Sequence, residues 1–138
     1  MSANSRKLCR SILEEVFGDL VASIGDKVHL WSGITFQQLL LPPRITKTKE
    51  SLAVLINHNL ITFRECSRAG KPIYYLSEER VISLLKYPRY LVMTKMLFGD
   101  EAELLVESLF KLGQCTLSSV IFTAIKRYKM AKVSTFLL

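Results

Sequence analysis

Hydrophobic residues recur every three or four positions along most of this chain, which is the spacing of amphipathic helices. In the first segment this spacing predicts one helix over 8–24, with Gly25 as its stop. Gly18 interrupts the apolar row, and we expect it to bend or split the helix because glycine is unfavourable in a helix interior. A short extended piece is expected over 29–33. The predicted inner row consists of Leu8, Ile12, Val16, Phe17, Leu20, Val21 and Ile24.

Two more helices are expected before residue 60. Thr35 is suited to cap a short helix over 35–41, which Pro42-Pro43 ends because proline lacks a backbone donor. A longer helix begins near Thr46, and Asn59 is a suitable stop. The buried stripe of that helix is predicted to be Thr48, Leu52, Leu55 and Ile56, and its opposite face Lys47, Glu50, Ala53 and Asn57.

Residues 60–76 predict a β-hairpin. Two β-prone runs, 60–66 and 72–76, flank a basic connection that contains Gly70, and Pro72 requires a strand start or an edge position. Helices followed by a hairpin bury their apolar faces only by packing together into one small α+β core. This order is typical of a winged helix-turn-helix, with the helix at 46–58 in the recognition position and the connection 67–71 as the wing.

The second half predicts helices without a second hairpin. We expect helices over 78–86, 91–97, 100–112 and 116–128, with Pro88 as an interruption and Asp100 with Glu103 as a capping box. A long helix, a glycine break and a short capped helix repeat the start of the chain. The expected fold class is therefore mostly α, with one complete winged helix at 1–86 and the helical start of a second at 87–138. Because no covering hairpin follows, we expect the chain to be cut short relative to this architecture and to expose apolar surface over 99–138.

The composition excludes several functional classes. Apolar residues make up 49% of the chain and charged residues 22%, which excludes a disordered or fibrous protein. No apolar run reaches the roughly 18 residues that span a bilayer, so no membrane partner is expected. The three cysteines form no CxxC pair, and Cys9 and Cys66 lie in apolar stripes, which favours buried small side chains over nucleophiles. His29 and His58 lie outside any metal-ligand pattern, and no phosphate-binding glycine loop is present, so we expect no metal, no cofactor and no enzyme activity.

The net charge of +7 is concentrated in the middle of the chain, where residues 36–99 carry ten basic and four acidic side chains. Eight residues of the recognition helix and the wing form the candidate DNA-binding site: Arg44, Thr46, Lys47, Lys49, Asn57, Arg64, Arg68 and Lys71. Six of them are basic and could follow a phosphate backbone. Only Asn57 and Thr46 could read bases, which favours sequence-independent binding.

Charge alone does not select DNA as the partner. Winged helices also dock proteins, and Ala53 and Val54 on the recognition helix would suit an apolar interface, so both interpretations stay open. A second basic stretch, 86–90, interleaves Tyr87 and Tyr90 with cations. These tyrosines could stack on unpaired bases. We favour packing between the two modules, because Pro88 indicates a structural corner.

Several strings resemble a known family. KLC at 7–9, FGDLVASIG at 17–25, LAVLINHNLITF at 52–63 and above all YPRYLVMTKMLFGDEAELLVESLFKLGQCTLSSV at 87–120 are similar to the N-terminal part of the RNA polymerase III winged-helix subunit that is related to the alpha subunit of TFIIE. The resemblance covers about residues 6–128.

The resemblance implies a non-catalytic nuclear subunit. Such subunits form a subcomplex with two other polymerase-specific subunits on the clamp of the largest subunit, and they act in promoter-directed initiation of small untranslated RNAs through contacts to DNA and partner subunits. Family members continue with further winged helices and a coiled region, from which this chain departs inside the second module. The alternative function from the residues alone is a free-standing winged-helix DNA-binding regulator.

Overall fold

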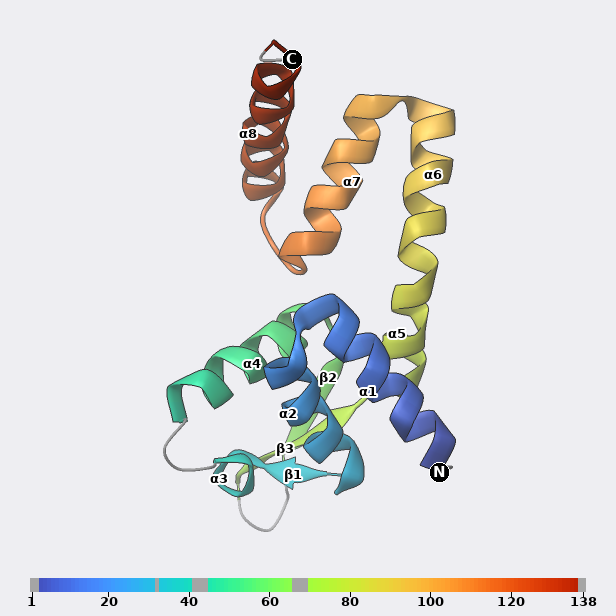
Figure 1. Ribbon diagram of the computed structural model, residues 1–138. Coiled ribbons are helices and arrows are strands. Elements are labelled where there is room, and N and C mark those ends of the chain that lie inside the picture. Colours follow the sequence, from blue (N-terminus) through green and yellow to red (C-terminus); the bar gives the residue numbers. More distant parts are fainter. Residues whose placement is uncertain (1–2, 32, 41–44, 66–69, 137–138) are drawn as a thin grey trace. The chain divides into compact units, whose positions relative to one another are not determined.

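The computed structural model describes residues 3–31, 33–40, 45–65 and 70–136 (Figure 1). The chain divides into two compact units, Met1–Leu85 and Lys86–Leu138.

The first unit begins with two helices that pack against each other, α1 (Ala3–Phe17) and α2 (Asp19–Leu30) (Figure 1). Gly18 separates them with a φ of 90°, so the expected split at this glycine is confirmed. The prediction that Gly25 stops the helix is wrong. Gly25 is buried inside α2, where an added Cβ would lie 2.5 Å from Leu13 Cδ1, so glycine serves the close approach of the two helices.

The buried side of α1 also differs from the predicted row. Leu8 and Val16, predicted to face inward, are 46% and 52% exposed, whereas α1 buries Leu13 completely together with Cys9 and Ile12. A single helical row cannot continue through Gly18, because the turn there resets the rotation of the chain. The expected extended piece over 29–33 is also wrong, since α2 continues through Leu30 and the first strand, β1, is Ile34–Thr35.

Two helices follow β1, as expected. In α3 (Phe36–Leu39) the side-chain oxygen of Gln38 accepts a hydrogen bond from the Thr35 backbone N–H at 3.0 Å. The next helix, α4 (Ile45–Asn57), is followed by Asn59, which adopts a left-handed φ of 59° and stops the helix as predicted. The Leu60 N–H then donates to the Leu55 carbonyl at 2.9 Å, which satisfies a terminal carbonyl of the helix.

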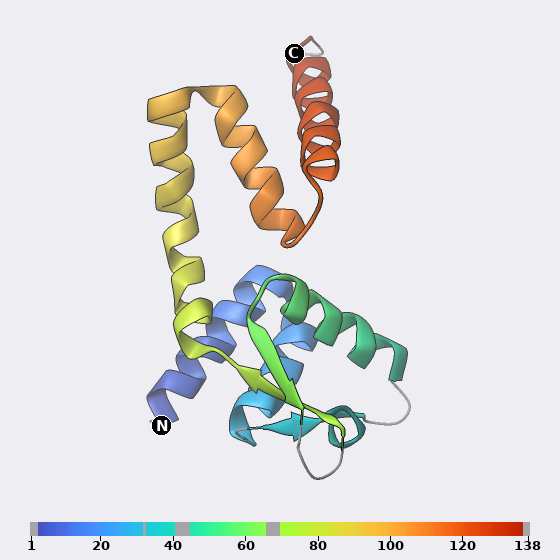
Figure 2. The same ribbon diagram turned by 180° about the vertical axis from the view of Figure 1, so that it is seen from behind.

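The predicted hairpin is confirmed as β2 (Ile61–Glu65) and β3 (Pro72–Leu76), which pair antiparallel (Figure 2). Strand β3 also pairs with β1, giving a three-stranded sheet in the order β1-β3-β2. Ile34 and Ile61 are buried on the face towards the helices, and α2 packs against β3. Helix α5 (Glu78–Ser83) and a 3-10 turn (Leu84–Lys86) complete the run. The predicted α+β winged-helix class is therefore confirmed.

The second unit contains three helices, α6 (Tyr87–Phe98), α7 (Asp100–Leu112) and α8 (Leu117–Phe136), with α7 packed against the other two (Figure 1). Pro88 lies in the first turn of α6 rather than between helices, because proline is tolerated where backbone donors have no helical partner. The predicted capping box at Asp100 and Glu103 is wrong. Gly99 occupies the N-cap position with a φ of 88°, and both carboxylates bind Lys95 Nζ, at 2.9 and 3.0 Å.

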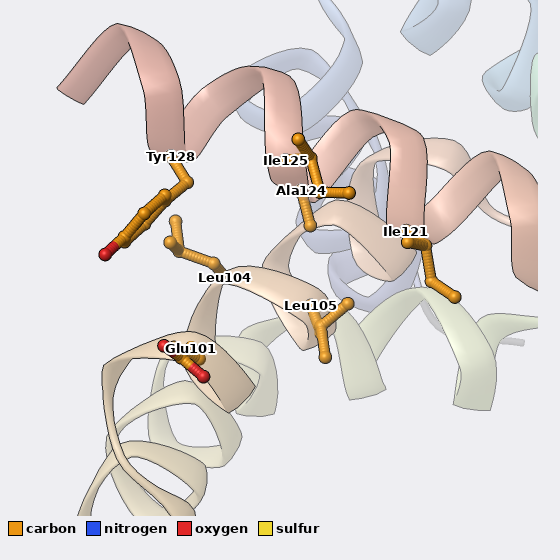
Figure 3. A pocket seen from close by; sticks show the side chains of 7 residues that line it. All are labelled: Glu101, Leu104, Leu105, Ile121, Ala124, Ile125 and Tyr128. Carbon is orange, nitrogen blue, oxygen red and sulfur yellow. The ribbon is translucent and has the colours of Figure 1, made fainter. Parts of the chain in front are cut away.

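The second unit buries few side chains. Among the described residues, only Ser108, Val120 and Ala124 of this unit are buried. Helices α7 and α8 leave an apolar groove of about 240 Å³ between them (Figure 3). Among all the described residues, no single helix is long and apolar enough to cross a membrane. Helix α7 and the part of α8 up to Met130 reach that length and hydropathy only together, as a pair bent by 118°.

Candidate nucleic-acid interface

The recognition helix α4 turns one side into the core of the first unit. Thr48, Leu52 and Leu55 are buried there as predicted, together with Ser51, which the prediction missed. Ile56, also predicted to be buried, is half-exposed. The outward side carries Thr46, Glu50, Ala53 and Asn57.

The two lysines of the first turns flank this outward side. Lys47 and Lys49 are two positions apart, so they point about 200° apart around the helix axis. Glu50 lies between them on the outward side. The start of α4 therefore offers two separate positive flanks around an acidic residue.

Lys49 and Lys71 both reach the short helix α3. Lys49 Nζ lies 6.0 Å from the centroid of the Phe36 ring, and Lys71 Nζ donates to Gln37 Oε1 at 3.1 Å. Because Phe36 and Gln37 are neighbours in α3, one flank of the recognition helix and the base of the wing meet at this helix. This is the part of the candidate site that the fold brings together.

Arg64 belongs to a different surface. Its guanidinium carbon lies 5.8 Å from the centroid of the Tyr75 ring, in the range of a cation–π contact. Arg64 is opposite Ile73 in the sheet register, whereas the core residue Ile61 is opposite Leu76. Alternate residues of a strand face opposite sides, so Arg64 lies on the face of the sheet away from the helices.

The remaining candidates are spread out or lie outside the described residues. Thr46 and Asn57 lie at opposite ends of α4, about 16 Å apart along its axis. Arg44 and Arg68 fall outside the described residues. The described candidates therefore form two basic positions at α3, one flank at Lys47 and one cation on the outer sheet face.

Sequence reasoning missed two exposed aromatic side chains of this unit. Phe63 in β2 is 60% exposed, with its ring centroid 6.4 Å from that of Tyr74, and Trp31 after α2 is 64% exposed. The alternation within β2 assigns Phe63 to the same face as buried Ile61, so no sequence signal separated them. The two side chains differ in exposure because Ile61 adjoins the end of α4, whereas Phe63 lies further along the strand.

His58 and Cys9 behave as structural residues. His58 packs edge-on against Phe17 with ring centroids 4.8 Å apart, and burial lowers its pKa, which favours the neutral form. Cys9 is buried as expected, and burial raises the pKa of its thiol. Cys66 lies outside the described residues. Among the residues with described positions, no group of three or more His, Cys, Asp or Glu side chains could hold a metal ion.

The ring of Tyr87, in the second basic stretch, packs against another aromatic ring. Its ring stacks on Phe110 of α7 with centroids 4.0 Å apart and an interplanar angle of 15°. This contact lies inside the second unit. Tyr90 is 44% exposed.

Comparison with known proteins shows which proteins have a similar sequence. Residues 7–65, which run from α1 through β2, match the helix-turn-helix domain of RNA polymerase III subunit RPC82. DNA-directed RNA polymerase III subunit RPC3 of Danio rerio is 35% identical over 131 residues, which cover 92% of this chain and 24% of that protein. The subunits of the same name from Rattus norvegicus and Homo sapiens are 41% and 39% identical over 120 residues, covering 83% of this chain and 22% of each relative.

The chain thus spans about a quarter of the length of these curated relatives. Similarity over most of this chain, together with the matched domain, agrees with the winged helix that the structure shows. The resemblance seen in the sequence is confirmed: residues 7–65 match the helix-turn-helix domain of an RNA polymerase III subunit, and most of the chain is similar to RNA polymerase III subunits named RPC3.

Proposed function

We propose that this chain acts as a non-catalytic subunit of nuclear RNA polymerase III in promoter-directed initiation of small untranslated RNAs. The observation that carries the proposal is the similarity to RPC3 over most of the chain, joined to a winged helix in its first unit. The partners proposed are the two other subunits of the initiation subcomplex and the clamp of the largest subunit. A free-standing DNA-binding regulator is not favoured, because the relatives named above are polymerase subunits.

Sequence-independent contact to DNA is the proposed role of the basic positions. Lys49 and Lys71 at α3, Lys47 on the other flank of α4 and Arg64 on the sheet supply positive charge near the recognition helix. Such contacts hold a duplex by its phosphates and carry no base information. Arg44 and Arg68 belong to the same proposal on sequence grounds, as do Thr46 and Asn57.

Two measurements test the proposal separately. A tagged chain should recover RNA polymerase III subunits from nuclear extract, and failure to recover any of them would refute assembly into the polymerase. Binding of a random duplex to the purified chain should weaken when Lys47, Lys49, Arg64 and Lys71 are changed together to Ala. The slope of log affinity against log salt should then fall by about 3 to 4, since each phosphate contact contributes about 0.9.

A matched variant removes the same charge elsewhere. Lys86, Arg89, Lys126 and Lys129 are exposed residues of the second unit, and their joint change to Ala also removes four cations. This variant should keep most of the affinity. Equal losses in both variants would show that net charge, rather than the winged-helix surface, attracts the duplex.

A further inference from the structure

Helix α3 is a short but firmly placed element of the first unit. Its Leu39 is fully buried, and the helix packs against α2, β1 and β3. At its start, the Gln38 side-chain oxygen accepts hydrogen bonds from the backbone N–H and the hydroxyl of Thr35, at 3.0 and 2.9 Å. A helix that is capped and anchored in this way can hold neighbouring side chains in fixed positions.

The sheet register brings the base of the wing to this helix. Thr35 of β1 pairs with Ile73 of β3 in an antiparallel ladder. Two residues after Thr35 comes Gln37, and two residues before Ile73 comes Lys71, whose Nζ donates to Gln37 Oε1 at 3.1 Å. The backbone pairing therefore determines this contact. Lys49 of α4 reaches the preceding residue of α3, with its Nζ 6.0 Å from the centroid of the Phe36 ring.

Both lysines are held by neutral groups. Lys71 donates to an amide oxygen, and Lys49 lies over an aromatic ring. Within the described residues no carboxylate pairs with either lysine, whereas Lys95 and Lys111 are each bound by a carboxylate. A neutral partner restricts a flexible lysine side chain without neutralising its charge. The two ammonium groups therefore remain available to an anion.

We propose that Gln37 and Phe36 are positioning residues, which hold the ammonium groups of Lys71 and Lys49 in place for the phosphates of a DNA duplex. This inference rests on the DNA contact proposed above and identifies the groups that prepare it. A lysine that is already ordered loses less conformational entropy on binding, and ordering one mobile side chain costs about two- to tenfold in affinity. Helix α3 thus links the recognition helix and the wing.

Gln37→Leu tests the inference on the full chain, because leucine has a similar size and cannot accept the hydrogen bond from Lys71. Affinity for a random duplex should fall about two- to tenfold. The slope of log affinity against log salt should stay unchanged, because Lys71 keeps its charge. Lys71→Ala should also lower the affinity, and it should reduce the slope by about 0.9 because one phosphate contact is lost.

Combined variants separate positioning from a structural role. In the Lys71→Ala background, Gln37→Leu should cause no further loss, because Gln37 acts through Lys71 alone. In the Lys47→Ala background it should cause the same loss as in the unchanged chain, since Lys47 lies on the other flank of α4. A structural role of Gln37, or a contact of its own amide with DNA, would instead lower the affinity in every background and would overturn the inference.

Phe36→Leu tests the second lysine in the same way. Leucine stays apolar but offers no ring face to a cation. The substitution should lower duplex affinity in the unchanged chain and cause no further loss when Lys49 is already Ala. Circular dichroism and denaturant unfolding check that each variant is folded. An equal loss with and without Lys49 would overturn the role of Phe36.

The outcomes distinguish this inference from the proposed function. If Lys71→Ala changes neither affinity nor slope, Lys71 does not contact phosphate, and its part in the proposed DNA contact fails together with the inference. If Lys71→Ala acts as expected and Gln37→Leu has no effect, only the inference is overturned. Gln114→Leu, at an exposed glutamine of the second unit, is the matched control and should keep full affinity. An equal loss in this control would also overturn the inference.

Discussion

Gly33 occupies a point next to β1 where the backbone and two side chains leave no room for a Cβ atom. Its φ is 128°, and an added Cβ would lie 2.8 Å from Tyr75 Cε1 and 3.0 Å from Ile73 Cγ2. Gly33→Ala should therefore destabilise the first unit by about 1–3 kcal/mol, from backbone strain and overpacking together. Trp31, the single tryptophan of the chain, lies in this unit, so denaturant unfolding followed by its fluorescence measures the loss.

Gly70 supplies the matched control. Its φ of 58° is also left-handed, but no atom lies within 4 Å of an added Cβ. Gly70→Ala should cost about 1 kcal/mol from strain alone. If both substitutions cost the same, crowding by Tyr75 and Ile73 contributes nothing and the interpretation of Gly33 fails.

At the scale of elements, the Glu78 carboxylate joins three helices of the first unit. Ser5 Oγ of α1 donates to Glu78 Oε2 at 2.5 Å, and His29 Nε2 of α2 lies 2.6 Å from Glu78 Oε1. The hydrogen bond from Ser5, and then that from His29, lowers the pKa of Glu78 below its ordinary value. The ionised carboxylate therefore fastens α5 to the first two helices.

Glu78→Gln should lose stability at neutral pH and not in acid. A carboxyl whose pKa is lower in the folded state contributes stability that is present above its unfolded pKa and disappears as pH falls through the folded value. Denaturation at a series of pH values gives the difference in free energy of unfolding between the two proteins. This difference should be full at pH 7 and should disappear below about pH 4. A difference that stays constant down to acid would mean that shape, rather than charge, decides at this position.

The sequence pattern predicted most elements but misplaced the boundaries that depend on tertiary contact. Gly18 and Gly25 are equivalent as local signals, yet one breaks the helix and the other lies inside it. Only the approach of Leu13 from α1 distinguishes them. Asn59 and the hairpin were predictable because their conformations are set within a few residues.

The candidate site was predictable as a set of residues and not as an arrangement. Basic side chains near the recognition helix are visible in the sequence. Lys49 and Lys71 both contact α3, whereas Arg64 lies on the outer face of the sheet. This arrangement follows from the pairing of β1 with β3 and from the sheet register. Such nonlocal pairing leaves no periodic signal in the sequence.

At the scale of the whole molecule, the two units differ sharply in how much apolar surface they bury. Among the described residues, fifteen buried apolar side chains lie in the first unit and two, Val120 and Ala124, in the second. Burial of apolar surface is the main source of folding free energy, so the units should differ in stability. Native-state hydrogen exchange should show amides of α2 and β3 opening at a higher free energy than amides of α6, α7 and α8.

Two core substitutions test whether the units also unfold separately. Leu55→Ala removes a fully buried side chain of the first unit and should lower the opening free energy of α2 and β3 by about 2–5 kcal/mol while exchange in α7 and α8 stays unchanged. Val120→Ala should accelerate exchange in α7 and α8 alone. If Leu55→Ala deprotected both units equally, they would form one cooperative body.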